Sequence, residues 1–292
     1  MKHASWIAFV CLSPSLALAQ KAAPAPATAP AAPMGPPKPA LQPALPSAQS
    51  RDLRQAPPAA GPAGAGQIEE LVAANRILPD QGVVDAFGHV SVRSDRDPNR
   101  YFLSRDLAPA LVTANDLMEF DLDSKPIDAK ERSLYRERFI HGEIYKARPD
   151  VMAIVHSHSP SLIAFSVSAI PLRPVFHMAA FVVEGVPVFD ATRFPGAPHT
   201  LIASTEIGRA LAQKLGAGSA VLILGHGAAV VGTSLPMAVG RAVYLEQSAK
   251  IQAQAMALGG PLTPLDGPAA RKASANSYAR AWDLWKRKVM MK

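Results

Sequence analysis

Cysteine and clustered charge are both scarce in this chain. Its 292 residues include a single cysteine, Cys11, so a disulfide cannot form within one chain and the domain that follows has no thiolate for catalysis or metal binding. Charged residues make up only 18% of the sequence. The formal net charge is +7, but no block of Lys and Arg alternates with aromatic residues. We therefore expect no nucleic-acid partner.

The first twenty residues, MKHASWIAFVCLSPSLALAQ, have the pattern of a secretory signal peptide. Lys2 precedes a short apolar stretch, and Ala17-Leu18-Ala19 supplies the small residues of a cleavage site. Ser13-Pro14 interrupts the apolar stretch, which is too short to span a bilayer as a stable helix. We predict a signal peptide over 1–19, a periplasmic or secreted protein, and no stable membrane span after cleavage. An uncleaved anchor and a cytoplasmic location are the alternatives.

Proline and alanine dominate the segment that follows. Residues 21–65 hold 12 of the 28 prolines, and such a composition buries too little apolar surface to offset the entropy of ordering. We predict a disordered Pro/Ala-rich linker over 20–65. Beyond it, strand-like and helix-like patterns alternate, which favours a layered α/β domain over 66–260. A helical extension over 261–292 is expected to follow.

Apolar periodicity predicts the individual elements of this domain. The expected strands are 89–93, 101–104, 117–123, 151–155 and 220–224. The expected helices are 67–78, ending before Pro79, then 133–147, 206–215, 236–258 and 277–289, the last with Trp282 and Trp285 on one apolar stripe.

Two histidines come directly after one of the buried strands. In VMAIVHSHSP, residues 151–160, His156 and His158 are two residues apart, so an extended backbone directs both imidazoles to the same side. LILGHGAAV places His226 after a second apolar run, between glycines that let the backbone approach a ligand closely. An isolated pair of this kind also occurs as surface or hydrogen-bonded core histidines, so the pair alone does not decide the matter.

A carboxylate shortly before the histidine pair strengthens the metal interpretation. Glu137 and His141 are four residues apart in a predicted helix and are expected on one face of it. Three histidines and one carboxylate suit one divalent ion, zinc or manganese, with a position left open for substrate. His141 by itself is interpreted as a structural residue.

Three motifs resemble the class II aldolase and adducin superfamily: GHVSVR, ERFIHGEIYKARPDVMAIVHSHSP and LGHGAAVVG. The resemblance covers about residues 66–260. It implies an α/β fold, a three-layer α/β/α domain with a largely antiparallel central sheet, and a homotetramer with active sites at subunit interfaces. It also implies that His156, His158 and His226 bind the metal. Glu137 stands where the family has its catalytic carboxylate, which can also contact the metal.

The small phosphate-binding residues of the family's sugar-phosphate aldolases are missing. Gly88-His89 stands in place of Gly-Asn, the segment 104–109 in place of a Thr/Ser-Pro-x-Gly loop, and Tyr135-Arg136 in place of two serines. This disfavours a phosphorylated substrate. The residues predicted to bind a carboxylate substrate are Gly88, Ser104, Arg105 and Arg136. Surface pairing of the two arginines with Asp106 and Glu131 is the alternative.

DAFGHVSVR, SRDLAPALVT and RPVFHMAAF are similar to a narrower branch of decarboxylases acting on hydroxylated aromatic or muconic-semialdehyde carboxylic acids. We interpret the chain as a metal-dependent carbon–carbon lyase that works through a metal-bound enolate. Glu137, with His89 and His177, would move the proton or orient a ring hydroxyl. One alternative is an aldehyde-lyase of the class II aldolase type on an unphosphorylated hydroxy-carbonyl substrate. Another is a non-catalytic, adducin-like or metabolite-binding domain.

Overall fold

The computed structural model describes residues 64–194, 200–273 and 277–291. The predicted signal peptide, with Cys11, and nearly all of the predicted linker lie outside these residues. Within them, no helix combines the length and the apolar character that a membrane crossing requires.

A seven-stranded sheet forms the centre of the described part of the chain, in the order β3-β2-β1-β4-β7-β6-β5. Neighbouring strands are antiparallel except for the parallel pair of β5 and β6. The strands are β1 (His89–Arg93), β2 (Arg100–Ser104), β3 (Leu117–Asp121), β4 (Ala153–Ser157), β5 (Val188–Phe189), β6 (Ala220–Ile223) and β7 (Gly227–Gly232).

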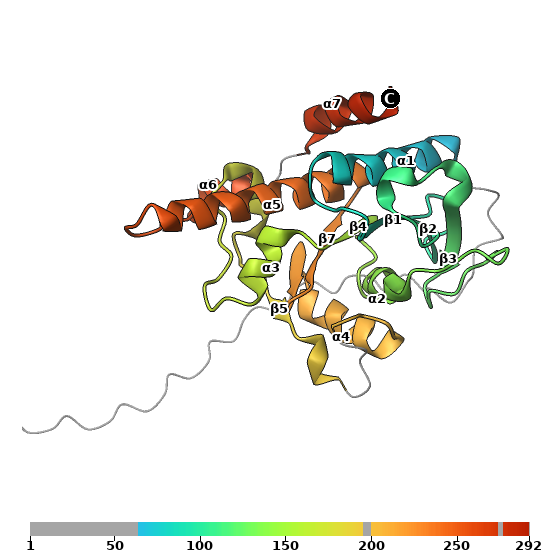
Figure 1. Ribbon diagram of the computed structural model, residues 1–292, viewed down its shortest axis with the longest axis horizontal. Helices are drawn as coiled ribbons and strands as arrows, with labels where there is room; N and C mark the ends of the chain where they lie inside the picture. The colour runs from blue at the N-terminus through green and yellow to red at the C-terminus, as the bar shows by residue number, and fades with distance from the viewer. Residues whose placement is uncertain (1–63, 195–199, 274–276, 292) are drawn as a thin grey trace, which may run out of the picture. The chain divides into compact units, whose positions relative to one another are not determined.

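Helices cover both faces of the sheet, with α1 and α5 on one side and α2 and α4 on the other (Figure 1). This confirms the predicted three-layer α/β/α domain with a largely antiparallel sheet. The α-helices are α1 (Ala65–Asp80), α2 (Phe139–Ala147), α3 (Pro160–Ser166), α4 (Thr205–Leu215), α5 (Leu235–Ala257), α6 (Gly267–Ala273) and α7 (Ala279–Met290). Short 3-10 turns are η1 (Pro109–Leu111), η2 (Ala114–Asp116), η3 (Arg136–Arg138), η4 (His177–Val182) and η5 (Ala191–Arg193).

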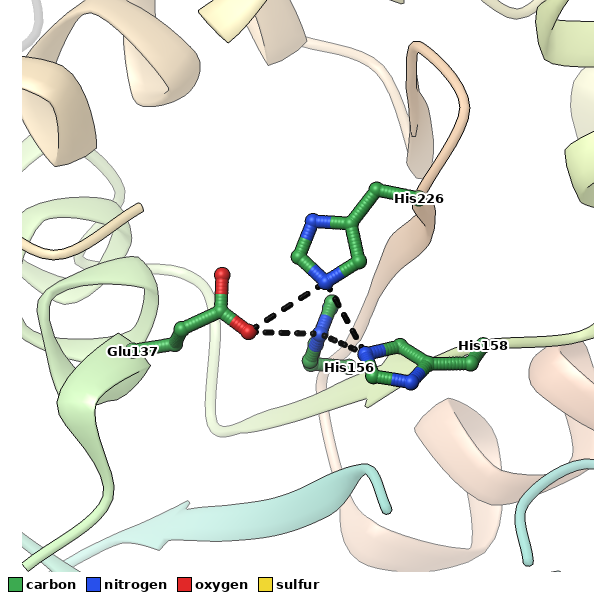
Figure 2. A group of neighbouring side chains, drawn as sticks. All are labelled: Glu137, His156, His158 and His226. Carbon is green, nitrogen blue, oxygen red and sulfur yellow. Dashed lines mark hydrogen bonds and ion pairs between the residues drawn. The ribbon is translucent and has the colours of Figure 1, made fainter. Parts of the chain in front are cut away.

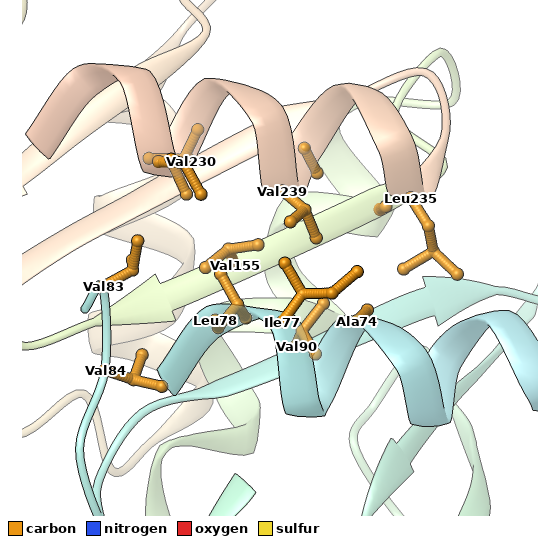
Figure 3. Close-up of a cluster of buried hydrophobic side chains, with 14 of the residues drawn as sticks. Ala74, Ile77, Leu78, Val83, Val84, Val90, Val155, Val230, Leu235 and Val239 are labelled. Carbon is orange, nitrogen blue, oxygen red and sulfur yellow. The ribbon is translucent and has the colours of Figure 1, made fainter. Parts of the chain in front are cut away.

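Side-chain alternation along the strands builds a separate apolar core on each face. Val90 of β1, Val155 of β4 and Val230 of β7 pack with Ile77 of α1 and Val239 of α5 (Figure 3). Each such side chain contributes about 1.5–3 kcal/mol when it is fully buried. The strands that carry the site residues are therefore held in place on one face of the sheet by α1 and α5.

The other core lies between the sheet and the helices α2 and α4. Ile154 of β4 and Val221 of β6 pack there with Ile144 of α2 and Leu211 of α4. Because residues i and i+2 of a strand share a face, His156 lies on the same side as Ile154. The first histidine of the pair is thus directed toward α2 and the segment before it.

The first helix does not end where we predicted. Pro79 lies inside α1, which continues to Asp80 before the chain turns at Gly82 with a φ of 69°. The proline ring is compatible with helical φ, and so near the end of the helix it removes only one backbone hydrogen bond. Proline was therefore a weaker stop signal than the glycine three residues later.

The C-terminal helix α7 is part of the same packed unit. Its Trp282 and Trp285 are buried in the core shared by α1 and α5, which agrees with the predicted apolar stripe. Lys286 and Lys288 of α7 pair with acidic residues of α1. Helix α7 therefore covers apolar surface of the domain.

Close contact between α2 and α4 depends on Gly208, and this predicts a specific loss of stability. A Cβ at this position would lie 2.6 Å from the carbonyl oxygen of Phe139. Helix propensity alone would make Gly208→Ala favourable by about 0.5–1 kcal/mol, whereas overpacking costs about 1–3 kcal/mol. We expect the clash to dominate and urea unfolding to show a lower free energy of unfolding.

Gly66→Ala is the matched control, because a Cβ there meets nothing within 4 Å. This variant should be neutral or slightly stabilised. Equal behaviour of the two variants would contradict the close-packing argument.

Candidate metal centre

Two neighbouring strands bring the three predicted histidine ligands to one end of the sheet. His156 is in β4, His158 follows that strand, and His226 directly precedes β7, the antiparallel neighbour of β4. A Cβ at Gly227 would lie 1.9 Å from the carbonyl oxygen of Ser157. Only glycine permits this approach, which brings His226 within reach of the pair on β4.

The ligand atoms of the three histidines and of Glu137 converge on one point (Figure 2). Nε2 of His158 lies 3.2 Å from Nε2 of His156 and 2.9 Å from Nε2 of His226. Oε2 of Glu137 lies 3.4 Å from Nε2 of His156 and 3.3 Å from Nε2 of His226. Zinc–nitrogen bonds of about 2.0–2.1 Å in a tetrahedron would place ligand atoms about 3.3 Å apart. The donor set therefore fits one divalent ion.

Backbone carbonyls fix the tautomers of two of these histidines. Nδ1 of His156 lies 3.1 Å from the carbonyl oxygen of Ala228, and Nδ1 of His226 lies 3.1 Å from that of Thr200. A carbonyl oxygen only accepts hydrogen bonds, so Nδ1 carries the hydrogen in both rings. The Nε2 lone pairs are left directed at the common centre, as metal ligation requires.

Glu137 reaches the centre from a single 3-10 turn, which corrects our prediction of a helix over 133–147. The α-helix begins only at Phe139, and Glu137 has φ −93° and ψ 16°. Glu137 and His141 therefore do not share a helix face, and His141 lies outside the ligand cluster. The 3-10 turn directs Glu137 toward the ends of the strands, while α2 packs on the sheet.

A backbone amide holds one oxygen of the Glu137 carboxylate in place. Oε1 accepts a hydrogen bond of 2.8 Å from the amide of Ile202, while Oε2 faces the histidines. Burial raises the pKa of this carboxyl, but the imidazoles of His156 and His226 outweigh that effect and hold the pKa well below its usual range. The group is therefore an ionised carboxylate, the form that binds a cation.

The histidine at the rim is held in its neutral form. Burial lowers the pKa of His158 to about 4, with the nearby imidazoles of His156 and His226 contributing. A neutral ring has the free lone pair that a metal ion needs. At neutral pH His158 is thus ready to coordinate without first losing a proton.

A pocket of about 260 Å³ opens beside the cluster, with Glu137, His156 and His158 in its wall. Gly88, His89 and Arg136, all predicted site residues, also line it. At Gly88 the φ is +99°, and a Cβ would lie 2.6 Å from Val84. Arg136 is exposed at the rim and, within the described residues, has no carboxylate partner.

Three of the residues predicted for catalysis or substrate binding do not line this pocket. Arg105 forms an ion pair of 2.7 Å with Asp116, which also differs from the surface pairing with Asp106 that we considered. Ser104 is buried and donates a hydrogen bond of 3.3 Å to Tyr135. His177 is exposed at the start of η4, where its ring contacts Phe176. Arg136 is therefore the one guanidinium of the predicted pair that reaches the pocket.

Several pocket features escaped the sequence analysis. Phe87 is 65% exposed at the rim, with its ring roughly parallel to that of His158 at 6.1 Å. Leu201 lines the pocket from a distant segment. Tyr135, which we had noted only as a replacement for serine, donates to the carbonyl of Leu107 and packs on His89. The local signal for Phe87 in the sequence was its position directly before the GHVSVR motif.

The chain belongs to the class II aldolase and adducin family, whose N-terminal domain matches residues 69–253. Decarboxylase tropJ from Talaromyces stipitatus is 34% identical over 248 residues, covering 76% of this chain and 93% of that protein. The 3,4-dihydroxyphthalate decarboxylase of Arthrobacter keyseri is 29% identical over 212 residues, covering 69% of this chain and 83% of that protein.

The fold has solved counterparts in the same family. L-fuculose 1-phosphate aldolase from Glaciozyma antarctica PI12 matches with a TM-score of 0.64 and 26% identity, covering 79% of this chain and 94% of that chain. Together with the two decarboxylases, it supports a lyase of the predicted superfamily and decarboxylase branch.

The geometry of the cluster predicts how metal retention responds to substitution. His156→Ala and His226→Ala each remove one of three converging nitrogens and should lose bound metal on dialysis, as measured by atomic emission. Glu137→Gln leaves three imidazoles in place and should keep most of the metal. His177→Ala is the control, because His177 is outside the cluster. Full metal content in both histidine variants of the cluster would exclude this centre.

Proposed function

We propose that the protein is a metal-dependent carbon–carbon lyase that decarboxylates a hydroxylated aromatic or muconic-semialdehyde carboxylic acid. The observation that carries the proposal is the Glu/His3 cluster beside a pocket lined by Phe87, Tyr135 and Arg136, whose guanidinium has no ion-pair partner in the part of the chain that the structure describes. Such walls suit a flat, carboxylated substrate. The two relatives named as decarboxylases support the same reaction class.

A divalent ion held by the cluster, zinc or manganese, would supply positive charge to the oxygen next to the breaking C–C bond. Glu137 is ionised at rest, so it acts first as a base that takes the proton of the substrate hydroxyl. Glu137 then gives this proton to the carbon that carries the carboxylate, which converts the substrate to its keto form. The C–C bond breaks, CO2 leaves, and the electron pair of the broken bond flows into the carbonyl group to form an enolate, which takes a proton from solvent. The anchored Oε1 of Glu137 keeps Oε2 aimed at the reacting atoms throughout.

Arg136 is proposed to hold the carboxylate that stays on the substrate. A guanidinium binds a planar carboxylate through two parallel hydrogen bonds. Arg136 forms no ion pair among the described residues, although Asp106 and Glu137 line the same pocket. Gly88 lets the backbone approach the substrate closely. His89 contributes a further polar contact from the pocket wall.

Aldol cleavage of an unphosphorylated hydroxy-carbonyl compound is the second candidate, favoured by the likeness to a solved aldolase. It also develops negative charge on an oxygen beside the breaking bond and uses the same donor set. A non-catalytic, adducin-like or metabolite-binding domain is less well supported, because all four ligand side chains are present and converge.

Assembly and location remain proposals from the sequence. We propose a homotetramer, as the superfamily implies, and a periplasmic or secreted enzyme exported by residues 1–19. Gel filtration with light scattering tests the first, and N-terminal sequencing of fractionated protein tests the second.

Release of CO2 from a substrate panel tests the proposed reaction. The zinc- or manganese-loaded protein is incubated with hydroxylated aromatic dicarboxylates and with muconic-semialdehyde carboxylates, beside an aldol-cleavage assay. We expect CO2 release that is lost in His156→Ala, because that variant lacks a metal ligand. Aldehyde release without CO2 would favour the aldolase alternative. Metal-loaded protein with neither activity would contradict both.

Arg136 and Arg105 form a matched pair for testing carboxylate binding. Arg136→Gln should raise KM by about tenfold to a hundredfold, because a hydrogen bond to a charged group is lost. Arg105→Gln should leave KM unchanged, since its guanidinium pairs with Asp116 outside the pocket. The opposite ranking of the two KM values would assign the substrate carboxylate to Arg105.

A further inference from the structure

A chain of four buried polar side chains leads from the pocket into the interior. Nδ1 of His89 lies 2.7 Å from Nε2 of His141, and Nδ1 of His141 lies 2.6 Å from Oγ of Ser91. Oγ of Ser91 lies 2.8 Å from Oη of Tyr145. The four residues are between 0% and 3% exposed, so no bulk water competes for these contacts.

The arrangement follows from the periods of the two elements that carry it. His89 and Ser91 are two apart on β1 and therefore face the same side of the sheet. His141 and Tyr145 are four apart on α2 and therefore share one helix face. Packing α2 onto β1 places these two polar pairs against each other, while Val90 and Val92 of the same strand face the opposite core.

Counting hydrogens fixes the direction of every bond in the chain. The hydroxyl of Tyr145 has one hydrogen-bond partner in the described structure, Ser91. Because a buried O–H group without an acceptor is costly, we assign Tyr145 as the donor to Ser91. The hydroxyl of Ser91 then donates to Nδ1 of His141. With Nδ1 accepting, the hydrogen of His141 is on Nε2 and is donated to Nδ1 of His89. The single hydrogen of His89 is therefore on Nε2.

We infer that His89 is fixed as the Nε2–H tautomer and donates a hydrogen bond to an anionic oxygen of the substrate. Its ring lines the pocket and packs 4.9 Å from the ring of His156, and Nε2 has no hydrogen-bond partner among the described residues. An N–H group cannot ligate a cation, which keeps this fourth histidine out of the metal cluster. The identification of this oxygen as a carboxylate oxygen rests on the proposed function. The tautomer rests only on the hydrogen-bonded chain.

The chain positions His89 and does not conduct protons. Transfer of the Nε2 proton out of the chain would require the hydrogens to shift outward and leave Tyr145 as a buried tyrosinate. Burial raises the pKa of Tyr145 far above its usual value, which opposes that state. His141, Ser91 and Tyr145 are therefore positioning residues, and His89 is the group that contacts the substrate.

Nitrogen NMR of the zinc-loaded full chain, labelled with ¹⁵N-histidine, tests the tautomer directly. We expect Nδ1 of His89 at the shift of an unprotonated ring nitrogen and Nε2 at that of a protonated one, with the signals assigned by their loss in His89→Gln. Protonation at Nδ1, or at both nitrogens, would overturn the inference.

Ser91→Ala and Ser124→Ala form a matched pair, because each serine is buried and hydrogen-bonded to a buried tyrosine, Tyr145 or Tyr101. Ser91→Ala opens the chain, so the His89 signals should move to averaged positions between the two tautomers while bound zinc is retained. Ser124→Ala should leave them unchanged. Unmoved His89 signals in Ser91→Ala would show that the chain does not set the tautomer.

Titration with salicylate, a small hydroxylated aromatic carboxylate, tests the contact. We expect the Nε2–H signal of His89 to shift with salicylate and not with phenol, which lacks the carboxylate. An unmoved signal would overturn the assignment of this donor to a carboxylate. The CO2 assay judges the proposed reaction separately, so failure of one leaves the other testable.

Discussion

Three imidazole nitrogens and one carboxylate oxygen converge on one point, and the rest of the structure holds them there. Two backbone carbonyls force the arrangement by holding the hydrogens of His156 and His226 on the far side of each ring. Lone pairs about 3 Å apart repel one another unless a positive charge lies between them. The ionised carboxylate of Glu137 also favours a cation at this point. The packing of β4 against β7, made close by Gly227, holds the rings at this separation.

The surrounding layers hold the ligand side chains in this arrangement in different ways. The apolar core under α1 and α5 keeps the strand ends from separating, and the contact of α2 with α4 fixes the turn that delivers Glu137. Beyond the ligands, His89 of β1 lines the pocket, and its ring also belongs to the polar contact between β1 and α2. The result is a largely buried Glu/His3 donor set beside a pocket whose rim, with Phe87 and Arg136, is much more exposed.

The sequence was sufficient for the features that depend on local spacing. The common side of the histidine pair and the alternation of β1 follow from a period of two residues, and each predicted ligand occurs in the cluster. Features set by contacts between distant segments could not be predicted. The amide of Ile202 is 65 residues from the carboxylate that it holds, and the His89–His141 contact spans 52 residues. Spacing alone could not decide which of the two predicted arginines reaches the pocket, because loop geometry directs Arg105 to Asp116.

The polar inner face of β1 has a practical consequence for protein engineering. Cavity-filling and consensus substitutions are common routes to higher stability, and a buried serine or histidine can be exchanged for an aliphatic residue in this way. Along this strand such a change would leave a hydroxyl or an imidazole deep in the domain without its partner, which is more costly than the gain in apolar volume. Stabilising variants should therefore change residues on the face of β1 that carries Val90, and leave His89 and Ser91 on the other face unchanged.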